Sequence, residues 1–182
     1  WATSGTALIT GGTGALGKHV ARWLVEQGAE HIVLTSRRGG SAPGADVIRS
    51  ELEAMGARVS IEACDVGDRI AVESLFGTLR EAGDAPRVVV HTAGILTMTM
   101  LDALTQEQLR AELSAKVDGA WHLHALTQED ALDAFVLYGS IAGLWGSGQQ
   151  AAYSAANAAL AGLAAYREQQ GAPVTCIHWG PW

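Results

Sequence analysis

The stretch Thr10-Gly11-Gly12-Thr13-Gly14-Ala15-Leu16-Gly17 decides the fold class of this 182-residue chain. It carries the spacing Gly-x-Gly-x-x-Gly between an apolar run, Ala7–Thr10, and a helical pattern, Leu16–Gln27. Glycines at this spacing allow a tight turn and a close approach to a pyrophosphate, which the free N–H groups of the helix start then bind. The glycine spacing alone is weak evidence for a binding site. Its position between a first strand and a first helix favours a turn that binds a ligand over a glycine-rich turn that binds none. We predict that a dinucleotide contacts Thr10, Gly11, Gly12, Thr13, Gly14, Leu16 and Gly17.

Short apolar runs alternate with longer helical patterns along the rest of the chain. The predicted strands are Ala7–Thr10, His31–Thr35, Arg58–Ala63, Arg87–Thr92, Ala134–Tyr138 and Val174–His178. These strands are apolar almost throughout, which is typical of the buried strands of parallel sheets. The pattern predicts an α/β fold with a doubly wound parallel sheet, in which ligands bind beyond the carboxyl ends of the strands. We see no internal boundary, so residues 1–182 are predicted to form one domain.

Composition excludes several classes of protein. Hydrophobic residues make up 48% of the chain and the net charge is −7, which argues against nucleic-acid and anionic-membrane partners. No apolar run approaches the roughly 20 residues that span a bilayer, and no signal peptide opens the chain. Cys64 and Cys176 lack a CxxC partner and are predicted to be buried free thiols in a reducing, cytoplasmic setting. The histidines show no metal-ligand spacing. Because the chain does not begin with Met, we expect it to be a fragment of a longer polypeptide.

The residues after the second strand indicate which dinucleotide is bound. An NAD site would place Asp or Glu about 20 residues past the glycines to hold the ribose 2′-hydroxyl. This chain has Ser36 there, followed by Arg37 and Arg38, and a guanidinium can pair with a 2′-phosphate and stack on adenine. The alternative is that Arg37 and Arg38 belong to a solvated basic loop that binds no cofactor. The missing acid favours NADPH, with Arg37 the better candidate.

Two further strand ends contribute to the predicted cofactor site. After the third strand, Asp65 could accept from the adenine amino group while Val66 packs on the ring, although Asp65 could equally cap the next helix. After the fourth strand, the segment His91-Thr92-Ala93-Gly94 has small residues that let the backbone approach a cofactor. We assign His91, Ala93 and Gly94 to the cofactor site. His91 on its own would be a packed core histidine, and it receives no catalytic role.

The fifth strand and the helix after it carry the predicted chemistry. A Ser hydroxyl, Ser140, follows the strand, and the next helix, Gln149–Tyr166, carries Tyr153 and Asn157. Positions i and i+4 share one face of a helix, so these two side chains can face the same site.

Together these residues resemble the short-chain dehydrogenase/reductase family, over almost the whole chain. The family's active-site helix reads Tyr-x-x-x-Lys, and Asn157 stands at the Lys position. One subfamily, the ketoreductase domains of modular polyketide synthases and animal fatty acid synthases, exchanges the Lys and Asn positions and has its Lys in a segment like 116–123 here. The only other lysine is Lys18, just after the glycine turn, so the resemblance assigns the catalytic lysine to Lys116.

This resemblance implies hydride transfer from NADPH to a ketone carbon and a role for each residue. Tyr153 would be the general acid, and the Lys116 ammonium would favour its phenolate and bind the nicotinamide ribose. Ser140 would hydrogen-bond the developing alkoxide, and Asn157 would hold the lysine or a relay water. Lys116, Tyr153 and Pro181 would also contact the cofactor.

The resemblance extends to stereochemistry. B-type polyketide synthase ketoreductases carry Leu-Asp-Asp after the fourth strand, whereas this chain has Leu96-Thr97-Met98. A-type domains have Trp eight residues before the catalytic Tyr, which is Trp145 here, and the A2 subtype has His where this chain has Gln150. The pattern resembles the A1 subtype, with an L-configured β-hydroxyl product. The alternative for Trp145 is a loop aromatic packed on the core.

The implied substrate is a β-ketoacyl group linked through phosphopantetheine to an acyl carrier protein, and the implied partners are other domains of the same synthase. The family's lid helix and its non-catalytic structural half are expected to be absent. Three alternatives compete: a non-reducing NADPH-binding domain with a structural or epimerase role, a nucleotide-sugar epimerase or stand-alone reductase, and an interaction module. The intact Tyr, Ser and Lys count against the first, Asn157 against the second, and the glycine turn with Arg37 and Lys116 against the third.

Overall fold

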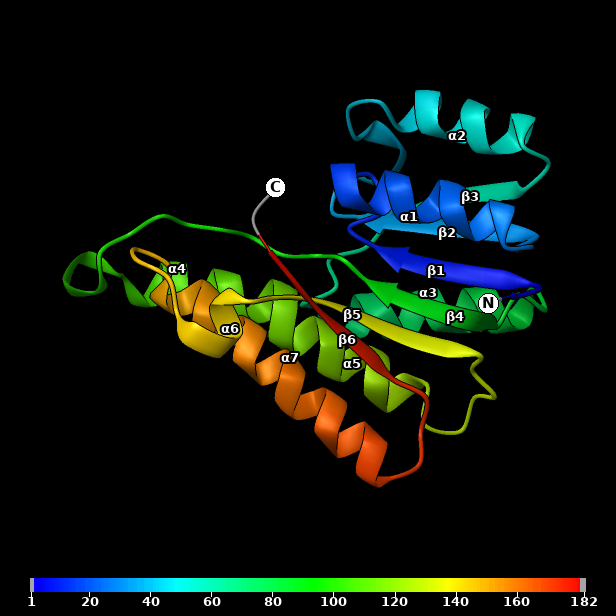
Figure 1. Ribbon diagram of the computed structural model, residues 1–182. Coiled ribbons are helices and arrows are strands. Elements are labelled where there is room, and N and C mark those ends of the chain that lie inside the picture. Colours follow the sequence, from blue (N-terminus) through cyan, green and yellow to red (C-terminus); the bar gives the residue numbers. More distant parts are fainter. Residues whose placement is uncertain (1, 181–182) are drawn as a thin grey trace.

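Six apolar segments pair side by side into one sheet in the computed structural model, which describes residues 2–180 (Figure 1). The strands are β1 (Thr6–Thr10), β2 (His31–Ser36), β3 (Arg58–Ala63), β4 (Pro86–His91), β5 (Ala134–Ser140) and β6 (Thr175–Trp179). All of their pairings are parallel. The six predicted strands are therefore confirmed, and no end differs from its prediction by more than two residues.

Helices fill the connections between the strands. The α-helices are α1 (Ala15–Glu26), α2 (Ala45–Ala54), α3 (Arg69–Glu81), α4 (Gln106–Leu113), α5 (Gly119–Leu126), α6 (Ala142–Trp145) and α7 (Ala151–Gln169). Short 3₁₀ turns cover Gly39–Ser41 and Leu101–Ala103, and a π-helical turn, η3 (Ser114–Asp118), joins α4 to α5. The predicted helix Gln149–Tyr166 thus begins two residues later and runs further.

The strand order is β3-β2-β1-β4-β5-β6. The chain winds outward from β1 in one direction and then returns to start again at β4, so the switch point lies between β1 and β4. In an open sheet of this kind the ligand crevice lies at the carboxyl ends of the strands beside that point. The predicted doubly wound, Rossmann-like α/β fold is confirmed.

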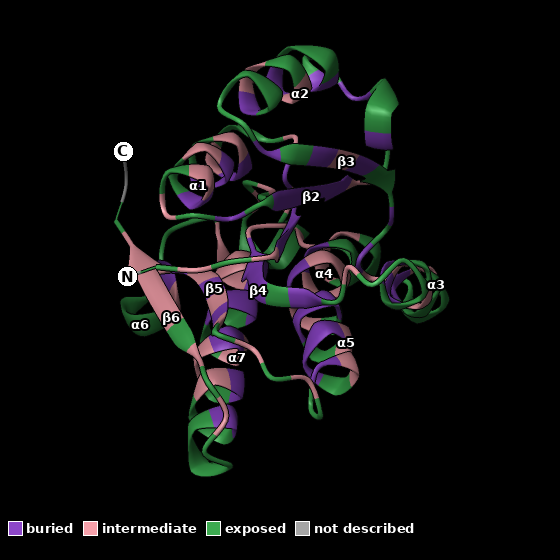
Figure 2. Cartoon of the chain, turned by 90° about the vertical axis from the view of Figure 1, so that its right-hand side faces the viewer, coloured by how far each residue is buried: buried purple, intermediate pink, exposed green. Residues whose placement is uncertain are grey.

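Two apolar cores cover the two faces of the sheet. Along β1, Ala7 and Ile9 point to the core under α1 and α2, whereas Leu8 points to the core under α3, α5 and α7. The alternation follows from the period-two geometry of a strand. Figure 2 shows buried residues concentrated in the central strands and on the inner faces of the helices.

Cys64 is buried and Cys176 is half-buried, and both are free thiols. Within residues 2–180 no helix has the length and apolar character needed to cross a membrane. The same part of the chain has no cluster of three His, Cys, Asp or Glu side chains that could hold a metal ion.

Candidate active site

The glycine turn after β1 has the geometry of a phosphate site. Gly11 adopts a left-handed φ of 67°, which favours glycine. A Cβ on Gly17 would lie 2.5 Å from the Cα of Gly12, so only glycine lets α1 pack this closely on the turn. Gly14 is the N-cap of α1 and no side chain caps the helix. The N–H groups of the first turn therefore remain available for an anion.

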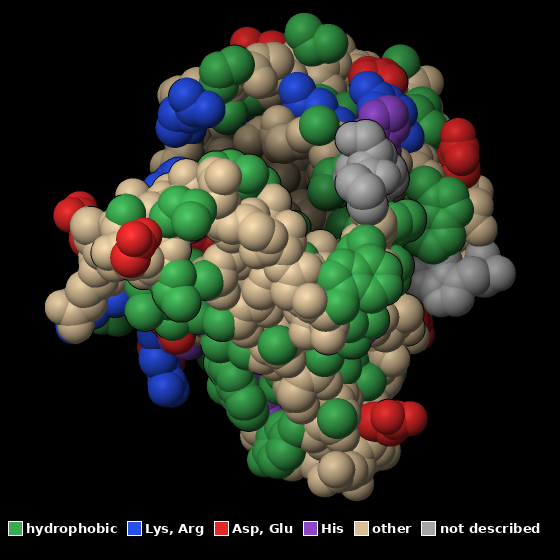
Figure 3. Space-filling view, turned by 60° about the vertical axis from the view of Figure 1, so that its left-hand side comes forward, with side chains coloured by type: hydrophobic (Ala, Val, Ile, Leu, Met, Phe, Trp, Pro, Cys, Tyr) green, Lys and Arg blue, Asp and Glu red, His purple; other side chains and the backbone are tan. Residues whose placement is uncertain are grey.

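A cavity of about 680 Å³ lies beyond the ends of β1, β2, β3 and β4. In the space-filling view a hollow opens on this face of the molecule, with Lys and Arg side chains along one border (Figure 3). Five of the predicted contacts in the glycine turn line the cavity, namely Gly11, Thr13, Gly14, Leu16 and Gly17, and Ala15 lines it as well. Two predicted contacts, Thr10 and Gly12, are buried beneath the turn and do not line it.

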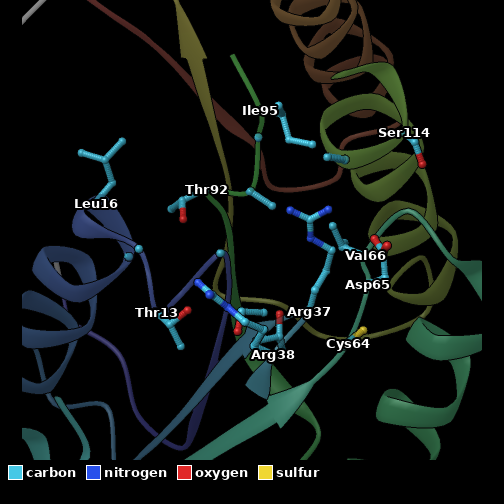
Figure 4. Close-up of a pocket in the computed structure, with 18 of the residues that line it drawn as sticks. Thr13, Leu16, Arg37, Arg38, Cys64, Asp65, Val66, Thr92, Ile95 and Ser114 are labelled. Carbon is cyan, nitrogen blue, oxygen red and sulfur yellow. The ribbon is translucent and has the colours of Figure 1, made fainter. Parts of the chain in front are cut away.

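The end of β2 supplies the cationic side of this cavity. Arg37 and Arg38 are exposed and extend from the strand end into it (Figure 4). Beside them, the Ser36 hydroxyl oxygen is buried and has no hydrogen-bond partner in the structure. A buried hydroxyl without a partner is costly, so a bound acceptor at this point would satisfy it. These residues fit the phosphorylated ribose of a dinucleotide.

Asp65 and Val66 line the same cavity after β3. The carboxylate of Asp65 accepts the N–H of Gly67 at 3.1 Å, which fixes the turn. The helix that follows is capped by Asp68, whose side chain accepts from the N–H groups of Ile70 and Ala71. The alternative that Asp65 is the helix cap is therefore wrong, because Asp68 occupies that position.

The end of β4 lies between the two halves of the site. Ala93 and Gly94 line the large cavity as predicted, and Gly94 also lines a second one. His91 does not line either cavity, because it is fully buried one residue deeper in the sheet.

The second cavity has a volume of about 220 Å³ and adjoins the first. Three of the four predicted catalytic residues line it, and each comes from a different element: Lys116 from the π-helical turn, Ser140 from the end of β5 and Tyr153 from α7. Leu16, Thr92, Gly94 and Ile95 line both cavities. A nicotinamide reaching from the larger cavity would therefore arrive beside the three side chains.

Lys116 lines the smaller cavity and is buried there, away from bulk solvent. The residue is 5% exposed, and its Nζ donates to the carbonyl oxygen of Tyr138 at 2.9 Å. Burial lowers the pKa of Lys116 to about 8, against a smaller opposing influence of Cys176. Lys116 is therefore a buried side chain and not a solvated one. Its Nζ lies 5.7 Å from the centre of the Tyr153 ring, close enough for its charge to act on that side chain.

Ser140 and Asn157 differ in how they are placed. The Ser140 hydroxyl accepts the N–H of Ala142 at 3.2 Å and lines the smaller cavity. Asn157 is fully buried and does not line it. Its amide donates to the backbone oxygen of Tyr153 at 2.8 Å, and its own Oδ1 has no partner. In this structure Asn157 supports the helix turn that carries Tyr153.

Three of the predicted stereocontrol residues, Leu96, Met98 and Trp145, are exposed apolar side chains, and the fourth, Gln150, is half-buried. Trp145 ends α6 and is 73% exposed, so it does not pack on the core. Leu96 and Met98 are also exposed, and Leu96 lines the smaller cavity. Gln150 lies before α7, where its amide contacts the Met98 sulfur at 3.4 Å. Pro181 lies outside the described residues.

Several lining residues were not predicted from the sequence. Thr92 and Ile95 follow β4 and contact both cavities, while Ser114 and Ala115 close the large one from the side of the π-helical turn. Thr92 and Ile95 adjoin Ala93 and Gly94, so their proximity to the predicted strand end was the available signal. Ala115 likewise adjoins Lys116, whereas Ser114 is next to no predicted site residue and had no such signal.

The fold and the two adjoining cavities define a dinucleotide-binding protein of the short-chain dehydrogenase/reductase type. Comparisons with known proteins identify the family. The model of the KR domain family matches residues 5–182. The chain is 54% identical over 182 residues to polyketide synthase GfsA of Streptomyces halstedii, covering all of this chain and 2% of that synthase. It is 50% identical over 182 residues to PikAIII, a pikromycin synthase component of Streptomyces venezuelae, of which it covers 12%.

Solved structures of similar proteins agree with this family assignment. A ketoreductase from the first module of phoslactomycin biosynthesis in Streptomyces sp. HK803 matches with a TM-score of 0.95 and 45% identity, over all of this chain and 43% of that one. A structure described as an A1-type ketoreductase matches with a TM-score of 0.94 and 48% identity, over 98% of this chain and 38% of that one. The chain belongs to the KR domain family, and its predicted identity as a ketoreductase domain of modular polyketide synthase type is confirmed. It spans less than half the length of these relatives.

Proposed function

We propose that this chain is the NADPH-binding catalytic subdomain of a polyketide synthase ketoreductase, and that it reduces a carrier-bound β-ketoacyl group to the L-β-hydroxyacyl product. One observation carries the proposal: Lys116, Ser140 and Tyr153 line a single small cavity that shares its wall with the large, cation-bordered one. A reductase needs a reduced cofactor and a proton donor at the same carbonyl group. The two adjoining cavities supply places for both.

Each side chain of the smaller cavity has a distinct task. When bound, a reduced nicotinamide supplies hydride to the carbonyl carbon. The Tyr153 hydroxyl gives its proton to the carbonyl oxygen as negative charge develops there. Lys116, whose pKa is about 8 and which is therefore mainly an ammonium at neutral pH, favours the phenolate that remains. The Ser140 hydroxyl hydrogen-bonds the same oxygen.

NADPH is favoured over NADH by the residues at the end of β2. Ser36, Arg37 and Arg38 line the large cavity, and a guanidinium binds phosphate in a charge-assisted, bidentate manner. The single carboxylate among the described lining residues is Asp65, which follows β3 instead of β2.

The L-configuration is supported by the exposed Trp145, by Gln150 at the start of α7, and by a relative described as an A1-type ketoreductase. The solved relatives are more than twice as long as this chain. We propose that it works within a longer cytoplasmic synthase polypeptide, where a lid helix, a structural half and an acyl carrier protein complete the site.

The test uses this chain extended to the length of the solved ketoreductases. The extended protein is given NADPH and a β-ketoacyl pantetheine thioester, and the configuration of the hydroxyl product is determined by chiral chromatography. Turnover with mainly L-product is expected. Mainly D-product would keep the reductase and overturn the A1 assignment. NADPH binding without turnover would favour the non-reducing domain, and no binding would refute the interpretation of the glycine turn and Arg37.

A further inference from the structure

We propose that His91 is a positioning residue, which holds the π-helical turn of Lys116 against the end of the sheet so that the lysine ammonium lies in the smaller cavity. The inference rests on the proposed reduction and extends it to a residue that contacts neither cavity. His91 is the last residue of β4 and has no exposed surface. Because His91 lies on a buried strand of the sheet, its backbone position is fixed.

The two ring nitrogens of His91 connect two parts of the site. Nδ1 lies 2.7 Å from the hydroxyl oxygen of Thr10, the last residue of β1. Nε2 lies 2.9 Å from the backbone oxygen of Lys116. The ring therefore bridges the strand before the glycine turn and the helix turn that carries the lysine.

The direction of both hydrogen bonds follows from chemistry. A backbone carbonyl can only accept, so Nε2 carries the proton and donates to Lys116. Complete burial, reinforced by the nearby Lys116 charge, lowers the pKa of His91 to about 3, so the ring is neutral and Nδ1 accepts from the Thr10 hydroxyl. Both ring nitrogens are satisfied, which makes this a single, well-defined arrangement.

The π-helical turn explains why such a contact is needed. In η3 the N–H of Gly119 bonds to the oxygen of Ser114, five residues earlier, in place of the four of an α-helix. π-Helical turns are rare in proteins, and the carbonyl groups around them are displaced from the regular ladder. His91 donates to one of them. Gly119 permits the approach, because a Cβ there would lie 3.2 Å from the His91 ring.

The Lys116 side chain is then fixed at both ends. Its backbone is tied to β4 through His91, and its Nζ is tied to β5 through the Tyr138 oxygen. Between these points the stem lies over Gly94, where an added Cβ would come within 2.9 Å of the Lys116 Cε. A shift of the backbone would be transmitted directly to the ammonium. A misplacement of about 1 Å in a catalytic group can cost roughly 100-fold in rate.

Two substitutions separate this role from simple filling of the core. In His91→Gln the side-chain nitrogen reaches about as far as Nε2 and retains a donor for the Lys116 carbonyl. In His91→Asn the amide reaches only as far as Nδ1, so it retains the Thr10 side and loses the Lys116 side. Both replace the ring with a smaller neutral amide.

Steady-state kinetics of the extended protein with NADPH and a β-ketoacyl thioester provide the first readout. We expect His91→Asn to lower kcat by about 100-fold with a much smaller change in KM, and His91→Gln to restore most of kcat. Equal losses in both variants, or no loss in His91→Asn, would overturn the positioning role.

A second readout does not depend on turnover. Lys18 and Lys116 are the two lysines of the 182 residues, so in ¹³Cε-lysine spectra of the extended protein Lys116→Arg identifies the Lys116 signal and Lys18→Arg identifies that of Lys18. The titratable groups near the Lys116 ammonium are the Cys176 thiol, the Tyr153 hydroxyl and the His91 ring itself. In the parent chain the Lys116 signal should titrate near 8. It should move toward the ordinary lysine value in His91→Asn and stay near 8 in His91→Gln.

The unaltered chain tests the contact even if His91→Asn fails to fold. Its ¹⁵N-histidine spectrum should show His91 with the proton on Nε2 and no titration between pH 5 and about pH 8. A proton on Nδ1 would refute the bond to Lys116. If both NMR tests succeed but the extended protein never oxidises NADPH, the position of Lys116 stands and the proposed function is refuted instead.

Discussion

The two cavities of the site are built in different ways. The large one, about 680 Å³, is formed mostly by backbone and small residues at consecutive strand ends, beginning with the turn Gly11–Gly17. The small one, about 220 Å³, is lined by residues from elements that are widely separated along the chain, and among them are Lys116, Ser140 and Tyr153. The first depends on local turn geometry, whereas the second depends on how α7 and the π-helical turn pack on β4 and β5. Cofactor binding and chemistry should therefore respond to different substitutions.

The largest effect is expected from removing the ammonium in the small cavity. Lys116→Met keeps a linear apolar stem but loses the charge that favours the Tyr153 phenolate. We expect kcat to fall by about 1,000-fold, within the range of general acid–base contributions, while NADPH still binds. The matched control is Lys18→Met, which should leave kcat near the parent's. A small loss of kcat in Lys116→Met would show that the two cavities are not divided as described.

The next effect concerns the large cavity. Arg37→Ala removes a guanidinium from the proposed 2′-phosphate site and should raise the Kd for NADPH by about 10- to 100-fold, with little change in the Kd for NADH. Fluorescence titration with both cofactors measures this directly. Arg69→Ala, on the exposed side of α3, serves as the control. Equal weakening of NADPH and NADH would place Arg37 away from the 2′-phosphate.

A smaller effect is expected on stability against pH. Lys116 has a pKa of about 8 in the fold and its ordinary 10.5 when unfolded, so the unfolded chain binds more protons between these values. Stability should therefore rise from pH 8 to pH 10.5, and the cost of burying the charge is fully present below pH 8. Relative to Lys116→Met, the rise should be on the order of 3 kcal/mol. Urea unfolding at the two pH values measures it, and parallel pH curves for the two proteins would contradict the burial of Lys116.

The same division explains what could be predicted from the sequence. Apolar runs such as His31–Thr35 and the glycine turn are local signals, so the strands, the first helix and the cofactor side of the site were found. The proposed catalytic residues Lys116, Ser140 and Tyr153 were predicted from the family resemblance, and the structure brings all three to one cavity. Their burial and partners were not predicted, because those depend on contacts between distant segments.

Three features show the limit of local reasoning. Asp68, not Asp65, caps α3, since both acids precede the helix and only the backbone path decides between them. The π-helical turn at Lys116 has no residue pattern that predicts it, and the residues it contacts, in α7 and at His91, are distant in the sequence. His91 was seen as a core histidine, but its bond to the Lys116 carbonyl joins residues 25 positions apart.

Tyr153→Phe tests the central claim most directly, because it removes one hydroxyl from the small cavity and nothing from the large one. In the extended protein, the Kd for NADPH should be close to the parent's, and single-turnover reduction of a β-ketoacyl thioester should be slower by about 1,000-fold or more. That result would separate a binding region from a chemical region as the structure divides them. Reduction at the parent's rate would remove Tyr153 as the proton donor, and a comparable loss of NADPH affinity would show that the two cavities act as one binding site.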